Sequence, residues 1–145
     1  MGTLYLCLTG GEIFTHPHFW EIYSELNKMG FLISLMSNGS LINEEVIEKF
    51  KEYGMPYFIK ITLYGASDET YFKTCGVKDG FTAVTKAIDL LIAENVPLKL
   101  TATIVKESTI VFDKNEKGYI SILKVLPVNK VAKSLLIKNA FEPVI

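Results

Sequence analysis

Three short turns carry the residue types that could do chemistry in this chain of 145 residues. The first turn is Gly10-Gly11-Glu12, which follows the apolar run "LYLCL". Glycines let backbone N–H and C=O groups approach a ligand, and a glutamate carboxylate accepts hydrogen bonds from a cation or an amine. Two later apolar runs end in similar polar turns, "SNGS" and "TLYGAS". Together the three turns predict one polar rim that binds a ligand.

Each turn taken singly also has an ordinary structural explanation. Glycine after a strand commonly makes a turn, "SNG" is a common turn sequence, and a glutamate just before a helix favours its N-terminus. The recurrence of such turns at three successive strand ends favours the ligand-binding interpretation. Nucleotide phosphate is not the expected ligand, because "TGGEIFTH" matches neither GxGxxG nor GxxxxGK and its glutamate would repel an anion.

The cysteines and histidines do not predict a metal site. Cys7 and Cys75 are the two cysteines of the chain, and they form neither a CxxC pair nor a disulfide framework, which is typical of a reduced intracellular protein. We expect Cys7 to be buried in a strand and Cys75 to be an accessible thiol in a loop. His16 and His18 could bind a metal ion if they shared the face of a strand, but Pro17 between them favours a helix-entry loop.

Composition limits the class of protein. Hydrophobic residues make up 49% of the chain, which is enough for one packed domain. Fifteen basic and sixteen acidic residues leave a net charge of -1, which favours neither a nucleic acid nor an anionic membrane as partner. No apolar run reaches the roughly 20 residues that span a bilayer, and the N-terminus lacks the pattern of a signal peptide. We therefore predict a soluble, cytoplasmic protein that binds neither nucleic acid nor membrane.

Two alternating periodicities predict the elements that position the three turns. Short apolar segments rich in β-forming residues predict four strands, and amphipathic segments between them predict three helices. The predicted strands are Thr3–Thr9, Phe31–Ser37, Tyr57–Tyr64 and Pro97–Val105; the helices begin after Pro17, at Asn43 and near Phe81, and end near Gly30, Gly54 and Asn95. Strands joined by helices run parallel, and ligands bind at their carboxyl ends. The predicted fold class is α/β with parallel β-α repeats.

Two long segments closely resemble the core of radical SAM enzymes, most of all those that modify peptides and proteins. They are "LTGGEIFTHPHFWEIYSELNKMGFLISLMSNGSLI" and "IKITLYGASDETYFKTCGVKDGFTAVTKAIDLLIAENVPLKLTATIV". The resemblance rests on GGE, on NG after the next strand, on the TLYG strand and on the G-x-F helix. It extends from about Leu4 to Val105 and implies a fragment of a partial (β/α)6 barrel of the TIM type.

The resemblance also implies the division of the chain. Residues 1–105 would form about four strands and three helices of the barrel. Residues 106–145 match the family less clearly, and we expect a divergent segment there, with one strand in "GYISILKVLP" and a short helix at Val131–Ile137.

In the family, the strand ends hold S-adenosylmethionine, and the GGE turn contacts the amino group of its methionine moiety. The resemblance therefore assigns cofactor binding to Gly10, Gly11 and Glu12. It implies that Asn38 lines the same cavity and that Thr62 lies near the ribose or the methionine carboxylate.

The chemistry of the family also requires a 4Fe-4S iron-sulfur cluster, which is usually held by cysteines spaced CxxxCxxC. This sequence has no such triplet, so we assign it no catalytic residue and no metal ligand. In the family, the cysteine loop follows the strand that precedes the GGE strand. We therefore expect a fragment whose complete parent binds S-adenosylmethionine beside the cluster and generates a deoxyadenosyl radical that modifies a peptide or other substrate. The alternatives are a non-catalytic remnant that binds S-adenosylmethionine or a partner, and a nonfunctional truncation.

Overall fold

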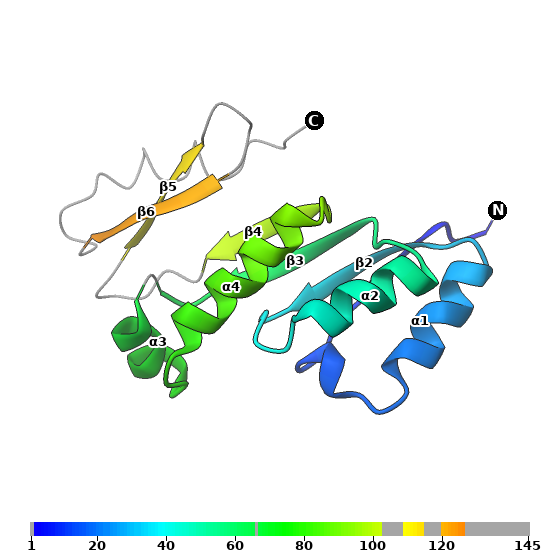
Figure 1. The fold of residues 1–145 in the computed structure, drawn as a ribbon, viewed down its shortest axis with the longest axis horizontal. Helices are drawn as coiled ribbons and strands as arrows, with labels where there is room; N and C mark the ends of the chain where they lie inside the picture. The colour runs from blue at the N-terminus through cyan, green and yellow to red at the C-terminus, as the bar shows by residue number, and fades with distance from the viewer. Residues whose placement is uncertain (1, 66, 103–108, 115–119, 127–145) are drawn as a thin grey trace. The chain divides into compact units, whose positions relative to one another are not determined.

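The computed structural model describes residues 2–65, 67–102, 109–114 and 120–126 (Figure 1). The chain divides into two compact units. The first contains residues 1–63 and 82–101, and the second contains residues 64–81 and 102–145. None of the helices in the described ranges is both long enough and apolar enough to cross a membrane.

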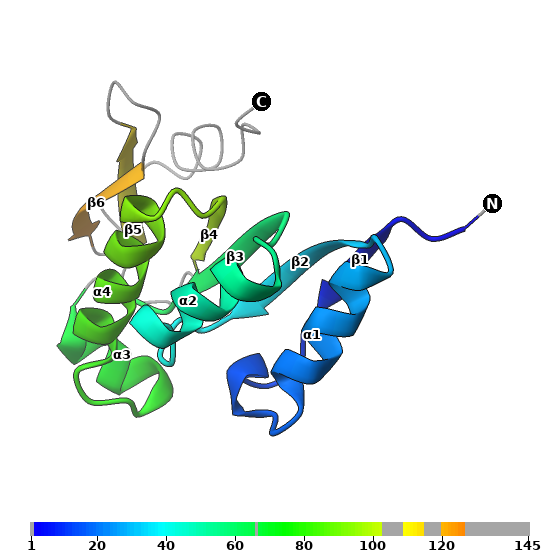
Figure 2. The ribbon, with the colours of Figure 1, turned by 45° about the vertical axis from the view of Figure 1, so that its right-hand side comes forward.

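The first unit is built on a four-stranded sheet in the order β1-β2-β3-β4. Its strands are β1 (Tyr5–Leu8), β2 (Leu32–Ser37), β3 (Phe58–Leu63) and β4 (Leu98–Ala102). β1 pairs in parallel with β2, and β2 pairs in parallel with β3. Figure 2 shows β1 at one edge of this sheet. The sheet confirms the predicted α/β class with parallel β-α repeats.

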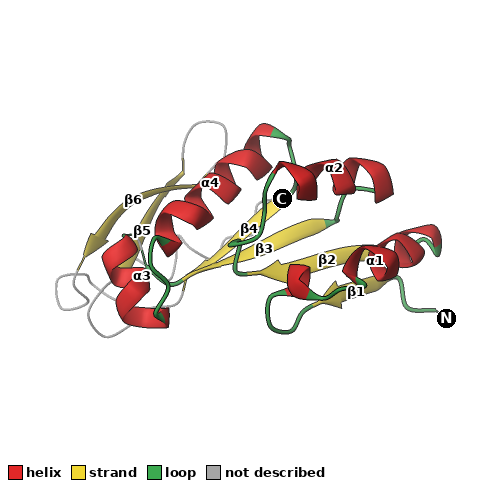
Figure 3. Cartoon of the chain, turned by 60° about the horizontal axis from the view of Figure 1, so that its bottom comes forward, coloured by secondary structure: helices red, strands yellow, loops and turns green. Residues whose placement is uncertain are grey.

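The helices of the first unit cover one face of the sheet, as Figure 3 shows. They are the 3₁₀ turn η1 (Ile13–Thr15), α1 (Phe19–Lys28), α2 (Glu44–Tyr53) and α4 (Gly80–Ala93). The predicted cap of α2 is present, because Asn43 Oδ1 accepts a hydrogen bond from the Val46 N–H at 3.1 Å. Gly54 ends this helix with a φ of +112°, which favours glycine.

The core lies between the helices and this face of the sheet. Alternate residues of β2 and β3 point into it, because side chains alternate across a strand. On the helix side the core contains an aromatic cluster, in which Trp20 packs 5.5 Å from Phe50 and 5.9 Å from Tyr23, measured between ring centroids. The fully buried members of this core include Tyr23, Ile33, Leu35, Ile47, Phe50, Ile59, Ile61, Leu63, Val84 and Leu91. The aromatic residues Phe19, Trp20 and Tyr23 of α1, which lie on one face of the helix by their spacing, therefore pack into the core.

The second unit contains a helix that the sequence prediction did not include, α3 (Asp68–Cys75). It begins with a capping box, in which the Thr70 N–H donates to Ser67 Oγ and the Ser67 N–H donates to Thr70 Oγ1. A Cβ on Gly65 would collide with the Thr70 side chain, which explains the glycine of "TLYG". An eight-residue helix carries few periodic apolar positions, so periodicity alone does not identify it.

The described part of the C-terminal segment forms an antiparallel hairpin of β5 (Thr109–Lys114) and β6 (Ile120–Leu126). β6 lies within the strand predicted from "GYISILKVLP", whereas β5 was not predicted. The short helix predicted at Val131–Ile137 falls outside the described residues.

Candidate functional site

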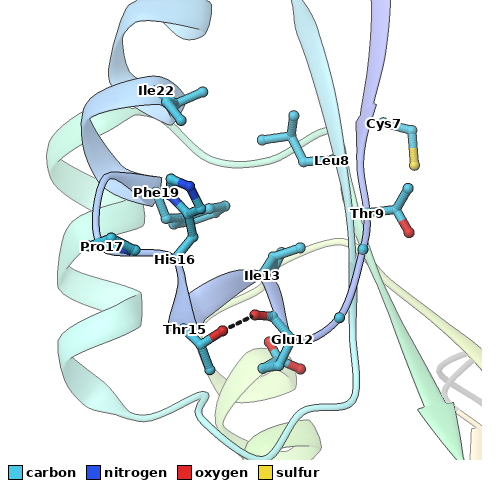
Figure 4. A pocket seen from close by; sticks show the side chains of 12 residues that line it. Cys7, Leu8, Thr9, Glu12, Ile13, Thr15, His16, Pro17, Phe19 and Ile22 are labelled. Carbon is cyan, nitrogen blue, oxygen red and sulfur yellow. Dashed lines mark hydrogen bonds between the residues drawn. The ribbon is translucent and has the colours of Figure 1, made fainter.

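Glu12 organises the turn after β1. As the N-cap of η1, it accepts a hydrogen bond from the Phe14 N–H at 3.4 Å through Oε1. Its carbonyl oxygen accepts from the Thr15 N–H at 3.1 Å and from the Thr15 hydroxyl at 2.6 Å (Figure 4). A Cβ added at Gly10 or Gly11 would meet nothing within 4 Å. The backbone of the two glycines is therefore accessible to a ligand.

The Glu12 carboxylate also joins this turn to the turn after β2. Its Oε1 accepts a hydrogen bond from the Ser37 hydroxyl at 2.8 Å, and its Oε2 accepts from the Asn38 N–H at 2.8 Å. Ser37 is buried, and its Oγ accepts in turn from the Gly39 N–H at 2.9 Å. One carboxylate thus fixes the carboxyl ends of two neighbouring strands relative to each other.

The donors that hold Glu12 are all neutral. In the part of the chain that the structure describes, no ion pair involves this carboxylate. Two carboxylate oxygens offer about four acceptor positions, and the three donors occupy three of them. The half-buried carboxylate, which no cation contacts among the described residues, therefore offers one remaining acceptor position. Among common ligand groups, an amine or ammonium matches this combination best.

A pocket of about 530 Å³ lies beside the same turn, between the carboxyl end of β1 and the start of α1 (Figure 4). The turn supplies its polar end, and mainly apolar side chains supply the rest. Its lining residues are Cys7, Leu8, Thr9, Gly10, Gly11, Glu12, Ile13, Thr15, His16, Pro17, Phe19 and Ile22. Because β1 is an edge strand of the described sheet, this pocket lies at the edge of the sheet and not over its centre.

The structure brings four of the five predicted cofactor-binding residues together. Gly10, Gly11 and Glu12 line the pocket, and Asn38 contacts Glu12 through its backbone N–H. The Asn38 side chain is used within its own turn, where Oδ1 accepts from the Ser40 N–H at 2.8 Å.

Thr62 is half-buried on β3, two strands away from the GGE turn. It follows Ile61, which lies opposite Ser37 in the sheet, so Thr62 lies near the level of Asn38. Neighbouring strands are about 4.8 Å apart, which separates Thr62 from the end of β1 by about 10 Å. Its predicted place near the ribose or the methionine carboxylate stays a prediction.

Ser37 is the site residue that the sequence prediction omitted. It lies at the last position of β2, where the alternation of "FLISLMS" puts it on the buried face with Ile33 and Leu35. A serine at a buried strand position needs a hydrogen-bond acceptor, and the Glu12 carboxylate is that acceptor. The alternation was the available signal, but the partner 25 residues away was not visible in the sequence.

The predictions for the two cysteines were wrong in part. Cys7 is exposed, because it lies on an edge strand and on the face turned away from the helices. Cys75 is exposed as expected, but it is the last residue of α3 and not part of a loop. Its Sγ donates a hydrogen bond to the Tyr71 carbonyl oxygen at 3.2 Å.

His16 and His18 lie in the helix-entry loop that Pro17 predicts. His16 is the C-cap of η1 and His18 is the N-cap of α1. His18 Nδ1 lies 3.0 Å from Glu21 Oε2, and both side chains are exposed. In the described ranges, no group of three histidine, cysteine or acidic residues could hold a metal ion.

The family model of the radical SAM superfamily matches residues 1–111. The chain belongs to the radical SAM superfamily. Over 114 residues it is 31% identical to the antilisterial bacteriocin subtilosin biosynthesis protein AlbA of Bacillus subtilis, covering 79% of this chain and 24% of AlbA. It is 28% identical over 108 residues to the AdoMet-dependent heme synthase of Methanosarcina barkeri, covering 74% of this chain and 31% of the synthase. The chain therefore spans about a quarter to a third of the length of these relatives.

Several solved structures share this fold. TYW1 with a lysine-pyruvate adduct bound superposes with a TM-score of 0.56 at 23% identity, over 70% of this chain and 33% of TYW1. The protein anSMEcpe with bound AdoMet superposes with a TM-score of 0.52 at 22% identity, over 66% of this chain and 28% of that protein. Such identities establish the fold alone, and they confirm the predicted relation to a TIM-like barrel.

The family implies S-adenosylmethionine and a 4Fe-4S cluster in the complete protein, and this chain fits the two groups differently. The open backbone of Gly10 and Gly11 and the remaining acceptor position of Glu12 suit the amino group of S-adenosylmethionine. Three thiolates for a cluster are not available, because the sequence contains only Cys7 and Cys75. The residues present thus fit the methionine side of the cofactor and do not fit the cluster.

Proposed function

We propose that this chain forms the part of a radical SAM domain that holds the methionine moiety of S-adenosylmethionine. The observation that carries this proposal is the Glu12 carboxylate, which keeps an acceptor position while the Ser37 hydroxyl and the Asn38 N–H fix its orientation. Gly10 and Gly11 would present backbone carbonyls to the same amino group, because no side chain covers them.

The residues of this chain would bind and orient the cofactor. Glu12 would accept a hydrogen bond from the amino group and balance its positive charge, Asn38 would hold Glu12 in position, and Thr62 would face the ribose or the carboxylate from β3. When bound beside a reduced iron-sulfur cluster, S-adenosylmethionine supplies a deoxyadenosyl radical that abstracts hydrogen from a substrate. The thiolates of that cluster would come from outside this sequence, because two cysteines are too few.

We propose a peptide as the substrate of the complete protein and the cytoplasm as its location. The similarity to AlbA, a bacteriocin biosynthesis protein, supports the peptide substrate. A content of two cysteines, both free, agrees with a reducing compartment. By itself, the chain is expected to bind S-adenosylmethionine without cleaving it.

Calorimetry with S-adenosylmethionine tests this proposal directly. We expect Glu12→Ala to weaken binding about tenfold, because a charge-assisted hydrogen bond contributes about 1.5 kcal/mol. Methylthioadenosine lacks the amino group, so its affinity should be the same for the wild type and for Glu12→Ala. Glu21→Ala is the matched control, since Glu21 is an exposed acid on α1 that does not line the pocket.

Two results would contradict the proposal. One is equal affinity of the wild type and Glu12→Ala for S-adenosylmethionine, and the other is an equal loss of affinity for both compounds.

Anaerobic reconstitution with iron and sulfide is the second measurement. A stoichiometric four-iron cluster that cleaves S-adenosylmethionine on this chain would overturn the view that it binds without catalysis.

A further inference from the structure

We infer that the sheet face turned away from the helices binds a carboxylate of the peptide substrate, between Lys60 of β3 and Lys99 of β4. This inference rests on the proposed function and adds the class of substrate, a peptide with an acidic side chain. It is carried by the position of the two lysines and by the distribution of charge over the sheet.

The two lysines lie on the same face of the sheet. In β3, the half-buried positions Phe58 and Lys60 alternate with Ile59 and Ile61, which are fully buried under the helices. Lys99 Nζ lies 3.8 Å from the centroid of the Phe58 ring, so Lys99 shares the face of Phe58 and therefore of Lys60.

The two lysines are also neighbours across the β3–β4 pair. The Ile59 N–H donates to the Pro97 carbonyl oxygen at 2.8 Å. In a parallel pair, this bond places Ile59 beside residue 98 and Lys60 beside Lys99. Adjacent strands are about 4.8 Å apart, and two ammonium groups on such stems can contact one carboxylate from both sides.

The charge on this sheet is unbalanced. The segments of β1 to β4 contain no acidic residue, and their two charged residues are Lys60 and Lys99. Among the residues that the structure describes, neither lysine takes part in an ion pair, whereas lysines on α1, α2 and α3 all do. Like charges on neighbouring strands repel each other, so an anion between them would relieve this repulsion.

The surroundings of the two lysines favour an organic anion over a small inorganic one. Phe58 packs 5.7 Å from Tyr57, and Tyr57 packs 5.7 Å from Tyr5, measured between ring centroids. Tyr5 and Tyr57 are more than half exposed. This aromatic row offers apolar contact next to the cationic pair, which suits a peptide that carries an acidic and an apolar side chain.

The lysine pair lies on the same side of the sheet as the predicted cofactor-binding residue of β3. Lys60 precedes Thr62 by two residues, which places it about 7 Å further from the carboxyl end of the strand. A carboxylate held there would place the rest of a bound peptide near the strand ends, where the GGE turn lies.

The test uses two blocked dipeptides, N-acetyl-Phe-Glu-amide and N-acetyl-Phe-Gln-amide. Their affinities for the full chain are measured from amide shifts in NMR spectra at low salt. We expect the glutamate dipeptide to bind about five- to tenfold more tightly, which corresponds to about 1 to 1.4 kcal/mol for the two partly exposed ion pairs together. This preference should disappear in Lys60→Ala/Lys99→Ala and persist in Lys60→Arg/Lys99→Arg.

The matched control is Lys78→Ala/Lys86→Ala, which removes the same charge from exposed positions outside the sheet. It should retain the preference for glutamate. Equal affinity of the wild type for the two dipeptides, the absence of any shift at Lys60 and Lys99, or a preference that survives in Lys60→Ala/Lys99→Ala would each overturn the inference.

Two further ligands separate the peptide from other carboxylates. If S-adenosylmethionine shifts the Lys60 and Lys99 amides and the dipeptides do not, the lysines hold the cofactor and the inference is wrong. The inference is also wrong if a porphyrin dicarboxylate shifts the Lys60 and Lys99 amides and the dipeptides do not. Neither result depends on Glu12, so failure of this inference is distinguishable from failure of the proposed function.

Discussion

Removal of the Glu12 carboxylate should destabilise the first unit by about 2 kcal/mol. Ser37 is 5% exposed, and its hydroxyl would lose its acceptor, which costs about 1–3 kcal/mol for a buried polar group. The N–H groups of Asn38 and Phe14 would also lose a partner, but they lie closer to solvent and can bond to water. Glu12→Gln keeps one oxygen acceptor and should cost about 1 kcal/mol.

Urea unfolding measures this difference through the fluorescence of Trp20, the single tryptophan of the chain, which packs in the aromatic cluster. The control is Glu25→Ala, which removes an exposed helical ion pair with Lys28 and should cost about 0.5 kcal/mol at most. The reasoning is refuted if Glu12→Ala lowers the urea midpoint no more than Glu25→Ala does, at an unchanged slope.

Three further predictions concern the core and its turns. Gly39→Ala should lower the free energy of unfolding in urea by about 1–3 kcal/mol more than Gly30→Ala does. Both glycines have φ near +80°, but only the Cβ at position 39 would meet another side chain, that of Val84 at 2.9 Å. Equal losses in the two variants would contradict this prediction. Phe50→Ala should cost about 3–5 kcal/mol and Phe50→Leu about 1 kcal/mol, because Phe50 is fully buried. Burial raises the pKa of Tyr23 and that of Tyr71 to about 12 each. Unfolded tyrosine ionises near pH 10, so the free energy of unfolding should fall as the pH rises from about 10 to 12. Tyr23→Phe should reduce this fall. The same pH dependence in the wild type and in Tyr23→Phe would count against the prediction.

Most of the first unit could be predicted from local patterns. The four strands of the sheet and the helices α1, α2 and α4 follow from the periods of apolar residues and from caps such as Asn43, which act over a few residues. The prediction failed where the pattern was short, as in α3, and where it gave no information about pairing, as in the unpredicted strand β5.

The candidate site divides in the same way. The GGE turn and Asn38 were recognisable as polar groups at strand ends, and parallel β-α repeats place the carboxyl ends of all strands on the same side of the sheet. The sequence did not indicate that Ser37 would complete the site, or that the Asn38 side chain would be used within its own turn. Both depend on hydrogen bonds whose geometry is decided after the strands pair.

The sequence by itself determined the class of fold, the position of the GGE turn at a strand end, and the family. These properties depend on residue type and on spacing over short distances along the chain. The tertiary structure alone decided that Glu12 bonds to Asn38, that Cys7 is exposed and that Lys60 lies beside Lys99. The physical reason is that strand order and register set which face and which edge a side chain occupies, and these arise from contacts between residues far apart in sequence.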